Sequence, residues 1–303
     1  MHLQQNDLVA LVSPAGQLSD PQIIVSAQKL LKKWGLRSYV GRYALNRNGH
    51  FAGNDQQRLE DFQAALDHPE VKLIWALRGG YGSIRIVDEL DFTKFKKQPK
   101  LVAGFSDITI IHQKIQKLGF ESLHAFMPVQ LKNKIPQMVV KQTKNALFGR
   151  PVSYSFNKHP QNTSFNVVKG TVTGGNLATL YSLLGTGLAP DTHHKILFIE
   201  DVSEPLYAID RMMIALKKAG KLQDLKALLV GQFTQIPPNT PGFGQSLYEI
   251  ILTHTQGKYP IIFDAPIGHV TQNYPLIFGR ELILTQDNSN VYLHQPASNH
   301  HEK

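Results

Sequence analysis

Short apolar runs alternate with stretches of helical periodicity along the first half of the chain. Consecutive apolar residues predict buried strands, and apolar residues three or four positions apart predict amphipathic helices. The expected strands cover residues 8–12, 71–77 and 101–104, and the expected helices cover residues 23–31 and 59–66. Such alternation is typical of a doubly wound, mostly parallel sheet, so residues 1–135 are predicted to form an N-terminal α/β domain. Ligands of these sheets bind at the carboxyl ends of the strands, where the turns after Val12, Leu77 and Gly104 are expected to meet.

The second half resumes this pattern after a polar segment that contains several prolines. We interpret residues 136–165 as a connector with one helix, at about residues 138–148, because Pro136, Pro151 and Pro160 stand there among polar residues. Residues 166–303 are predicted to form a C-terminal domain. Its expected strands cover residues 167–172, 196–199, 228–230, 261–263, 281–284 and 291–293, and its expected helices begin at Asn176 and Ala208. The polar tail from Gln295 is expected to fray.

Length and composition indicate a globular protein of about two domains, since the chain has 303 residues, of which 42% are hydrophobic and 18% charged. The absence of cysteine excludes a disulfide framework, a cysteine nucleophile and thiolate metal sites. The first residues, Met1 to Asp7, lack the apolar core of a signal peptide, and no later run is long enough to span a bilayer. We therefore expect a cytoplasmic enzyme that does not associate with membranes.

The formal net charge of +9 indicates an anionic partner or simple solubility. The lysines are spread over several predicted helix faces and ends, and no basic run is interleaved with aromatic residues. No zinc-finger or RNA-recognition signature is present. We therefore expect no nucleic acid, and we interpret the charge as steering toward an anionic small ligand or as an aid to solubility.

Ser106 stands at a predicted turn between a strand and a helix. The apolar run of residues 101–103 ends at Gly104, and helical spacing begins after Asp107. A serine at such a turn projects its hydroxyl over the end of a sheet, beside a helix N-terminus, which suits a nucleophile and its oxyanion. The match to Gly-x-Ser-x-Gly is incomplete, because Ile108 replaces the second glycine. A helix cap is the commoner role for such a serine, so this segment alone leaves both roles open.

A glycine-rich turn, Arg78-Gly79-Gly80-Tyr81-Gly82, follows the second predicted strand. It matches neither Gly-x-Gly-x-x-Gly nor the P-loop pattern, so no nucleotide cofactor is expected. Its backbone N–H groups can approach an anion closely, although a tight turn without a ligand fits the same residues.

Other catalytic and metal signatures are weak. Ser26 and Lys29 match Ser-x-x-Lys, but they lie inside a predicted helix without the accompanying motifs. The adjacent histidine pairs at residues 193–194 and 300–301 do not share a helix face, and no His-Glu-x-x-His occurs, so no metal site is expected. His112 and His124 are expected to have core or surface roles.

Two further residues follow predicted strands in the second half. Glu200 ends the apolar run of residues 196–199, and His269 follows the strand at residues 261–263. An acid at a strand end can orient a histidine, although such an acid is more often solvated or a helix cap. With Ser106, these residues give serine, acid and histidine in chain order.

Over nearly its whole length the chain resembles the L,D-carboxypeptidases of the muramoyl-tetrapeptide type, a family that also contains the microcin-immunity peptidases. The motifs that carry the resemblance occur in the family's order, and they are Val12-Ser13-Pro14-Ala15-Gly16, Arg78-Gly79-Gly80-Tyr81-Gly82, Gly104-Phe105-Ser106-Asp107-Ile108-Thr109, Gly174-Gly175-Asn176-Leu177, Phe198-Ile199-Glu200-Asp201 and Gly268-His269. The resemblance favours a nucleophilic role for Ser106 over a helix cap.

The resemblance implies a serine peptidase without metal or cofactor. Ser106 would be the nucleophile, His269 the general base, and Glu200 the acid that orients it. The N–H of Asp107, with that of Gly79 or Gly80, would form the oxyanion hole. The family combines an N-terminal α/β domain with a smaller β-rich C-terminal domain, places its site between them and commonly forms homodimers.

The implied substrate is the cytoplasmic peptidoglycan tetrapeptide, an anionic muropeptide that loses its terminal D-alanine after diaminopimelate. Ala125-Phe126-Met127-Pro128 departs from the family pattern, where His-Gly-Pro or similar is expected after His124. This departure affects expected substrate contacts but not the proposed triad.

Two other hypotheses remain. The same triad would serve an immunity-type peptidase that acts on a peptidyl- or aminoacyl-nucleotide, although the stretch from Glu200 to Pro205 is more similar to the recycling branch. A non-catalytic peptide-binding α/β protein would have lost a triad residue, and none is lost here.

Overall fold

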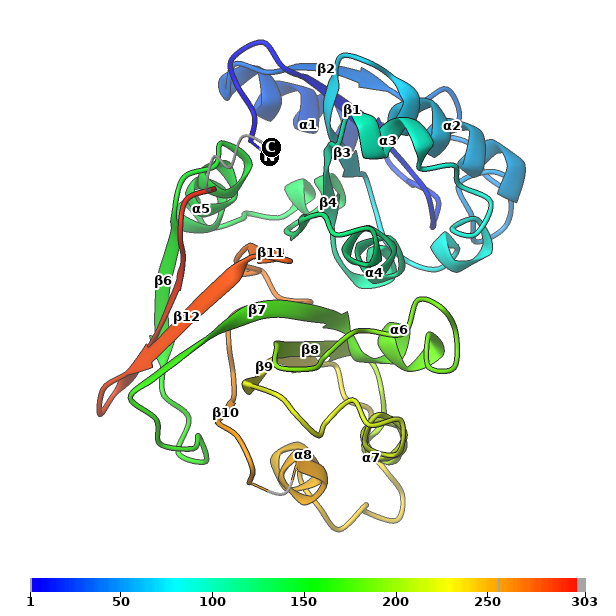
Figure 1. Cartoon of the computed structure of the whole chain (residues 1–303). Helices are drawn as coiled ribbons and strands as arrows, with labels where there is room; N and C mark the ends of the chain where they lie inside the picture. Colours follow the sequence, from blue (N-terminus) through cyan, green and yellow to red (C-terminus); the bar gives the residue numbers. More distant parts are fainter. Residues whose placement is uncertain (1, 256, 299–303) are drawn as a thin grey trace.

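Two β-sheets organise the chain, and Figure 1 shows one above the other. The computed structural model describes residues 2–255 and 257–298. The end of the expected frayed tail lies outside these residues. Within them, no helix is long and apolar enough to cross a membrane.

The first sheet has the strand order β11-β5-β4-β3-β1-β2. Its strands are β1 (Leu8–Val12), β2 (Arg37–Val40), β3 (Val71–Ala76), β4 (Leu101–Gly104), β5 (Ser122–His124) and β11 (Leu276–Phe278). All neighbours are parallel except β11, which runs antiparallel to β5. The predicted doubly wound, mostly parallel sheet is therefore confirmed.

Helices cover both faces of this sheet, since alternate residues of a strand point to opposite sides. Val9 and Leu11 pack with α1 (Gln22–Lys33), and Ala10 and Val12 share a second apolar cluster with α2 (Asp55–Asp67), α3 (Thr93–Lys97) and α4 (Thr109–Lys117). Burial on both sides explains why the central strands are continuous apolar runs.

The second sheet has the order β10-β9-β8-β7-β12-β13-β6. Its strands are β6 (Val152–Asn157), β7 (Val167–Asn176), β8 (Ile196–Val202), β9 (Ala227–Thr234), β10 (Ile261–Ile262), β12 (Glu281–Gln286) and β13 (Asn290–Gln295). The strands from β10 to β7 are parallel, and those from β7 to β6 are antiparallel. The helices of this half are α6 (Leu177–Ser182), α7 (Leu206–Lys218) and α8 (Leu247–Thr255), and they pack against the parallel strands.

Both sheets contain strands that the sequence pattern did not reveal. The segment interpreted as a connector holds α5 (Gln137–Leu147), close to its predicted position, and also β6, which pairs with β13. Strand β11, from the second half, extends the first sheet. Each sheet therefore takes a strand from beyond the expected domain boundaries at residues 135 and 165, namely β11 in the first sheet and β6 in the second. The boundaries themselves stay a prediction.

Helix α4 holds the two sheets together, and Figure 1 shows it between β4 and β7. The Gln113 amide donates to the carbonyl of Gly174 at 3.0 Å, and the N–H of Asn176 donates to the Thr109 hydroxyl at 3.1 Å. A Cβ on Gly175 would lie 2.5 Å from the Thr109 hydroxyl oxygen, so glycine permits this approach. The strand ends of both sheets therefore face each other.

Candidate active site

Ser106 lies on a sharp turn between β4 and α4, opened by a single 3₁₀ turn at Ser106–Ile108. Its φ is +64°, a left-handed conformation that side chains rarely adopt and that is often found at functional sites. A Cβ on Gly104 would lie 2.9 Å from Cγ1 of the buried Ile108. The turn thus accommodates the isoleucine that interrupts the Gly-x-Ser-x-Gly pattern because Gly104 lacks a side chain.

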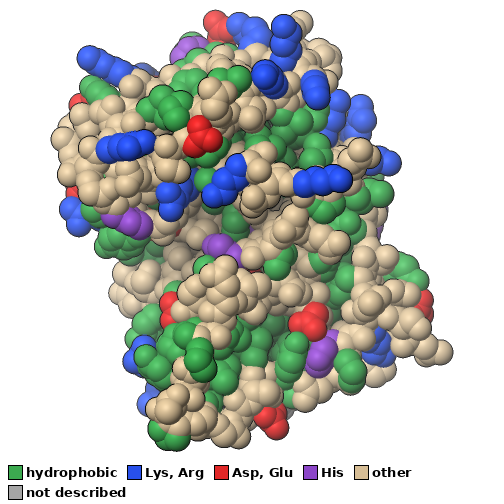
Figure 2. All heavy atoms as spheres, turned by 180° about the vertical axis from the view of Figure 1, so that it is seen from behind, with side chains coloured by type: hydrophobic (Ala, Val, Ile, Leu, Met, Phe, Trp, Pro, Cys, Tyr) green, Lys and Arg blue, Asp and Glu red, His purple; other side chains and the backbone are tan. Residues whose placement is uncertain are grey.

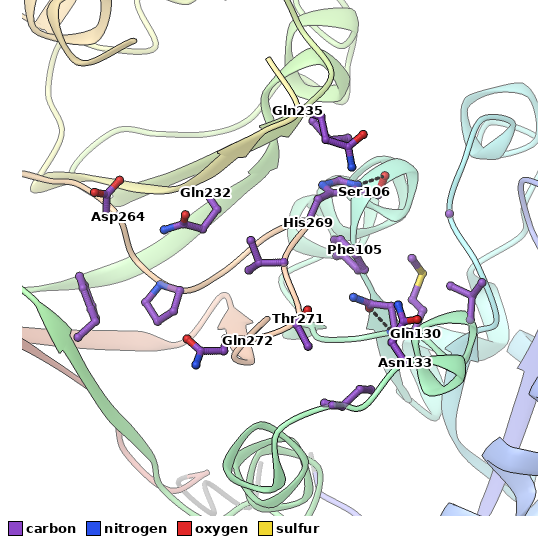
Figure 3. A pocket seen from close by; sticks show the side chains of 18 of the residues that line it. Phe105, Ser106, Gln130, Asn133, Gln232, Gln235, Asp264, His269, Thr271 and Gln272 are labelled. Atoms are coloured by element: carbon purple, nitrogen blue, oxygen red, sulfur yellow. Dashed lines mark hydrogen bonds between the residues drawn. The ribbon is translucent and has the colours of Figure 1, made fainter. Parts of the chain in front are cut away.

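His269 joins Ser106 to Glu200 in one hydrogen-bonded chain. Its Nδ1 lies 2.7 Å from Oε2 of Glu200, and its Nε2 lies 3.1 Å from Oγ of Ser106. With the Nδ1–H donating to the carboxylate, Nε2 accepts the serine proton. The ring packs at 4.8 Å between centroids against Phe105, the residue before the serine. Figure 3 shows His269 pointing toward Ser106 at the edge of a pocket.

Glu200 is fully buried on β8. Two glycines leave room for its side chain: a Cβ on Gly268 would lie 2.7 Å from Oε2, and one on Gly231 would lie 3.1 Å from the Glu200 Cβ. The second carboxylate oxygen, Oε1, has no hydrogen-bond partner among the described residues. Among the described residues, the contact with His269 is therefore the one hydrogen bond that the Glu200 carboxylate forms.

Burial of the imidazole lowers the pKa of His269, but the charge and hydrogen bond of Glu200 more than offset this, so the pKa is raised above its ordinary value of 6.5. Asp201 adds to the rise from further away. The carboxylate therefore stabilises the imidazolium that forms when His269 takes a proton.

Asp201 points to the opposite face of β8 and has a different role. It accepts hydrogen bonds from the Asn176 amide and the N–H of Ala178, each at 2.8 Å, and so fixes the start of α6. Burial and the neighbouring Glu200 charge raise the pKa of Asp201 to about 7. Of the two adjacent acids, only Glu200 contacts His269.

The predicted oxyanion residues lie around Ser106. A Cβ on Gly79 would lie 3.1 Å from the Ser106 Cβ, and both Gly79 and Gly80 line the same pocket as Ser106. The buried Asp107 carboxylate accepts the N–H of Ser83 at 2.9 Å, which ties the glycine-rich turn to the serine turn. Burial raises the pKa of Asp107. The structure thus brings Asp107, Gly79 and Gly80 to the nucleophile, and their role in binding an oxyanion stays a prediction.

The pocket beside Ser106 and His269 has a volume of about 1180 Å³. Turns that follow strands of the first sheet and residues on strands of the second sheet line its walls, and the segment that departs from the family pattern contributes Met127. Phe126 is buried, and its carbonyl accepts the Trp75 indole N–H at 3.1 Å. Of this segment, Met127 is therefore the side chain placed to affect substrate contacts.

His112 and His124 are core residues, as expected. Burial lowers the pKa of His112 to about 4 and that of His124 to about 3, so both are neutral. His112 donates to the carbonyl of Gly104 at 3.0 Å. His124 donates to Oδ1 of Asn273 at 3.0 Å, and the same oxygen accepts the N–H of Gly268 at 2.9 Å.

Asn273 was not predicted from the sequence. It fixes the residue before His269 to β5, and so positions the base relative to the first sheet. A single asparagine in a loop gives no sequence signal for such a role.

The weaker sequence signals lie elsewhere. Ser26 and Lys29 are part of α1, as expected. Across residues 2–255 and 257–298, no group of three His, Asp or Glu side chains is arranged to hold a metal ion. The pair at residues 300–301 lies outside the described residues.

A serine, a histidine and an acid in one hydrogen-bonded chain form the arrangement of serine hydrolases, which recurs on unrelated folds. The chain matches the LD-carboxypeptidase N-terminal domain over residues 9–125 and the LD-carboxypeptidase C-terminal domain over residues 169–284. It therefore belongs to the LD-carboxypeptidase family, and we describe it below as a carboxypeptidase.

Individual relatives agree with this assignment. A probable murein peptide carboxypeptidase of Bacillus subtilis is 32% identical over 286 residues, which cover 91% of this chain and 88% of the relative. The crystal structure of a muramoyltetrapeptide carboxypeptidase from Oxalobacter formigenes superimposes with a TM-score of 0.86 at 28% identity, covering 95% of this chain and 98% of that one. The microcin C7 self-immunity protein MccF in complex with aspartyl sulfamoyl adenosine has a TM-score of 0.83 at 19% identity, covering 98% of both chains, which shows a shared fold.

Proposed function

We propose that this carboxypeptidase is a serine enzyme that releases the terminal D-alanine from a muropeptide tetrapeptide. The observation that carries the proposal is the chain of hydrogen bonds from Ser106 through His269 to Glu200, at the edge of a pocket that is large enough for a peptide. The relatives named for murein and muramoyltetrapeptide substrates support this choice of substrate.

In the proposed mechanism, Oγ of Ser106 attacks the carbonyl carbon of the L,D-peptide bond while Nε2 of His269 takes the hydroxyl proton. The N–H of Asp107, with that of Gly79 or Gly80, stabilises the oxyanion. His269 then gives its proton to the amine of the departing D-alanine. A water molecule hydrolyses the acyl-enzyme with His269 again as the base, and Ser106 is regenerated.

The charge of the chain supports an anionic substrate. Figure 2 shows Lys and Arg side chains gathered over the upper part of one face, the part that holds the first sheet in Figure 1. Arg78 and Lys158 line the pocket, and among the described residues neither forms an ion pair. Such cations attract a ligand with several carboxylates.

The proposal also includes a cytoplasmic location, a homodimer and no nucleic-acid or membrane partner.

Mass spectrometry of two digests tests this proposal. Purified protein is incubated with a murein tetrapeptide and, separately, with a peptidyl-nucleotide. We expect loss of one alanine from the tetrapeptide and a much slower reaction of the nucleotide. Cleavage of the nucleotide compound alone would replace the recycling role with that of an immunity-type peptidase. If neither compound is cleaved, the result would favour the non-catalytic, peptide-binding protein.

A further inference from the structure

The pocket contains a carboxylate that the proposed mechanism does not use. Among the described residues that line it, Asp264 is the one acidic side chain. It follows β10 on the loop that leads to His269. Figure 3 shows Asp264 and Gln232 on one side of the pocket, and Gln130 and Asn133 on the other.

The loop holds Asp264 in a fixed orientation. Its φ is +61°, in the left-handed region. The Tyr248 hydroxyl, on α8, donates to the carboxylate and lies 3.1 Å and 3.2 Å from its two oxygens. The Tyr248 ring stacks on His159 at 4.2 Å between centroids. The next residue, Ala265, is held on both sides, because its N–H donates to Val230 and its carbonyl accepts from Gln232.

The charge of Asp264 lacks a partner in the protein. The side chain is half-buried, yet no Lys, Arg or His within residues 2–255 and 257–298 forms an ion pair with it. One hydroxyl donor leaves most of the acceptor positions of a carboxylate unused. A partly desolvated, oriented carboxylate is matched best by a ligand cation with several N–H donors, which is the chemistry of an ammonium group.

We infer that Asp264 binds an ammonium group on the acyl portion of the substrate. The inference rests on the proposed function. The leaving group is a single amino acid whose nitrogen belongs to the bond that breaks, so it carries no ammonium group in the bound peptide. A cation at Asp264 must therefore come from the part of the substrate that acylates Ser106. The enzyme then selects peptides in which that part carries an amine.

Two tetrapeptides that differ only in the residue before the terminal D-alanine test this inference. One has lysine there, and the other has norleucine, which keeps the carbon chain but lacks the ammonium group. We expect wild-type kcat/KM to favour the lysine peptide by about 10- to 100-fold, the range for a hydrogen bond to a charged group. Asp264→Asn should reduce this preference to about 3-fold or less.

The chain offers a matched control. Asparagine tolerates the left-handed backbone, so Asp264→Asn keeps the loop. Asp210 is also partly buried and also bonded to an α8 side chain, since it lies 2.7 Å from Nε2 of His254, but it does not line the pocket. Asp210→Asn should retain the lysine preference. A wild-type enzyme without that preference, or an Asp264→Asn enzyme that retains it, would overturn the inference.

A binding measurement separates this inference from the proposed function. Calorimetry on Ser106→Ala protein measures the Kd of both peptides without turnover. Tighter binding of the lysine peptide that is lost when Asp264→Asn is added supports the ammonium subsite. This holds even where the wild-type protein cleaves neither peptide, because absence of cleavage would refute only the proposed function. Equal Kd values would refute the subsite even where the wild-type protein cleaves both peptides.

Discussion

At the scale of single residues, the charge of Glu200 determines how His269 titrates. The carboxylate raises the pKa of His269 against the opposing effect of burial. Because the base must be neutral to accept the Ser106 proton, kcat/KM should rise with pH through the pKa of His269. The acidic limb of the profile is therefore expected above the ordinary histidine value of 6.5.

Glu200→Gln should move this limb to lower pH, because the charge that raises the pKa is removed. It should also lower kcat by about ten-thousand-fold, the loss seen in a comparable triad when the acid becomes an amide and selects the wrong tautomer. Rates on the tetrapeptide across a pH series measure both effects.

A double-mutant cycle with His269→Ala serves as the control for this change. The two losses should not add, because the residues act as one unit. Additive losses, or a limb that stays in place, would show that Glu200 does not orient the base.

At the scale of elements, the loop after β10 assembles several parts of the site. It carries Asp264, then His269, and then Asn273, which binds the N–H of Gly268. Gly268 has a φ of +128°, and a Cβ there would lie 2.7 Å from Oε2 of Glu200. The close approach of loop and carboxylate therefore depends on this glycine.

Gly268→Ala should displace the Glu200 carboxylate from His269. We expect kcat to fall by about a hundred-fold, as for a misplacement of about 1 Å, and the strained backbone to lower stability by about 1–3 kcal/mol. Gly187→Ala is the control, because a Cβ there meets nothing within 4 Å and its φ is not positive. Tetrapeptide kinetics and thermal unfolding of both variants give the result, and a Gly268→Ala enzyme as active as the control would contradict this role.

The sequence predicted the elements whose signals are local. The central strands of the first sheet are almost entirely buried, so they consist of apolar runs that the sequence shows directly. Strand β2 reads Arg-Ser-Tyr-Val at the sheet edge, and β5 and β11 have three residues each, which is too short for a periodic signal. Strand β6 lies in the polar segment that was interpreted as a connector, and it pairs with β13, which lies more than a hundred residues further along the chain.

In the candidate site, too, residues with a local sequence signal could be predicted, and residues that act through distant contacts could not. Ser106, Glu200 and His269 could be named from the sequence because each follows a predicted strand. Asp264 also follows a predicted strand. Its place in the pocket could not be predicted, because segments that are distant in the sequence form that pocket. Asn273 acts through contacts with His124 and Gly268, which only the folded chain brings together.

At the scale of the whole molecule, the buried histidines make stability depend on pH. The pKa of His112 is lowered to about 4 in the fold, against 6.5 as its ordinary value, so below pH 6.5 the unfolded chain binds a proton that the folded chain does not. The free energy of unfolding should therefore fall as pH falls from 6.5 to about 4, by about 1.4 kcal/mol per pH unit for this residue.

His112→Gln should reduce that slope by the same amount. The glutamine amide can still donate to the carbonyl of Gly104, but it does not titrate. Urea unfolding of both proteins across this pH range measures the difference in slope. Parallel curves would show that His112 is not held neutral in the fold.

Catalysis by the whole enzyme should not require a metal ion. In the proposed mechanism His269 activates the Ser106 hydroxyl, and backbone N–H groups stabilise the oxyanion, so each catalytic role has a protein group. Dialysis against EDTA should leave tetrapeptide hydrolysis within about two-fold of the untreated rate, since neither the nucleophile nor the oxyanion stabilisation is removed. Loss of activity that added zinc restores would contradict the serine mechanism.

The most direct test of the serine mechanism compares wild-type and Ser106→Ala protein on the murein tetrapeptide by mass spectrometry of released D-alanine. The variant keeps the fold, because only a hydroxyl is removed, and circular dichroism checks this. We predict release of one D-alanine per tetrapeptide by the wild-type protein and a loss of about a million-fold in the variant, as in other triads that lose the nucleophile. Hydrolysis by folded Ser106→Ala protein at a rate near that of the wild type would contradict the account.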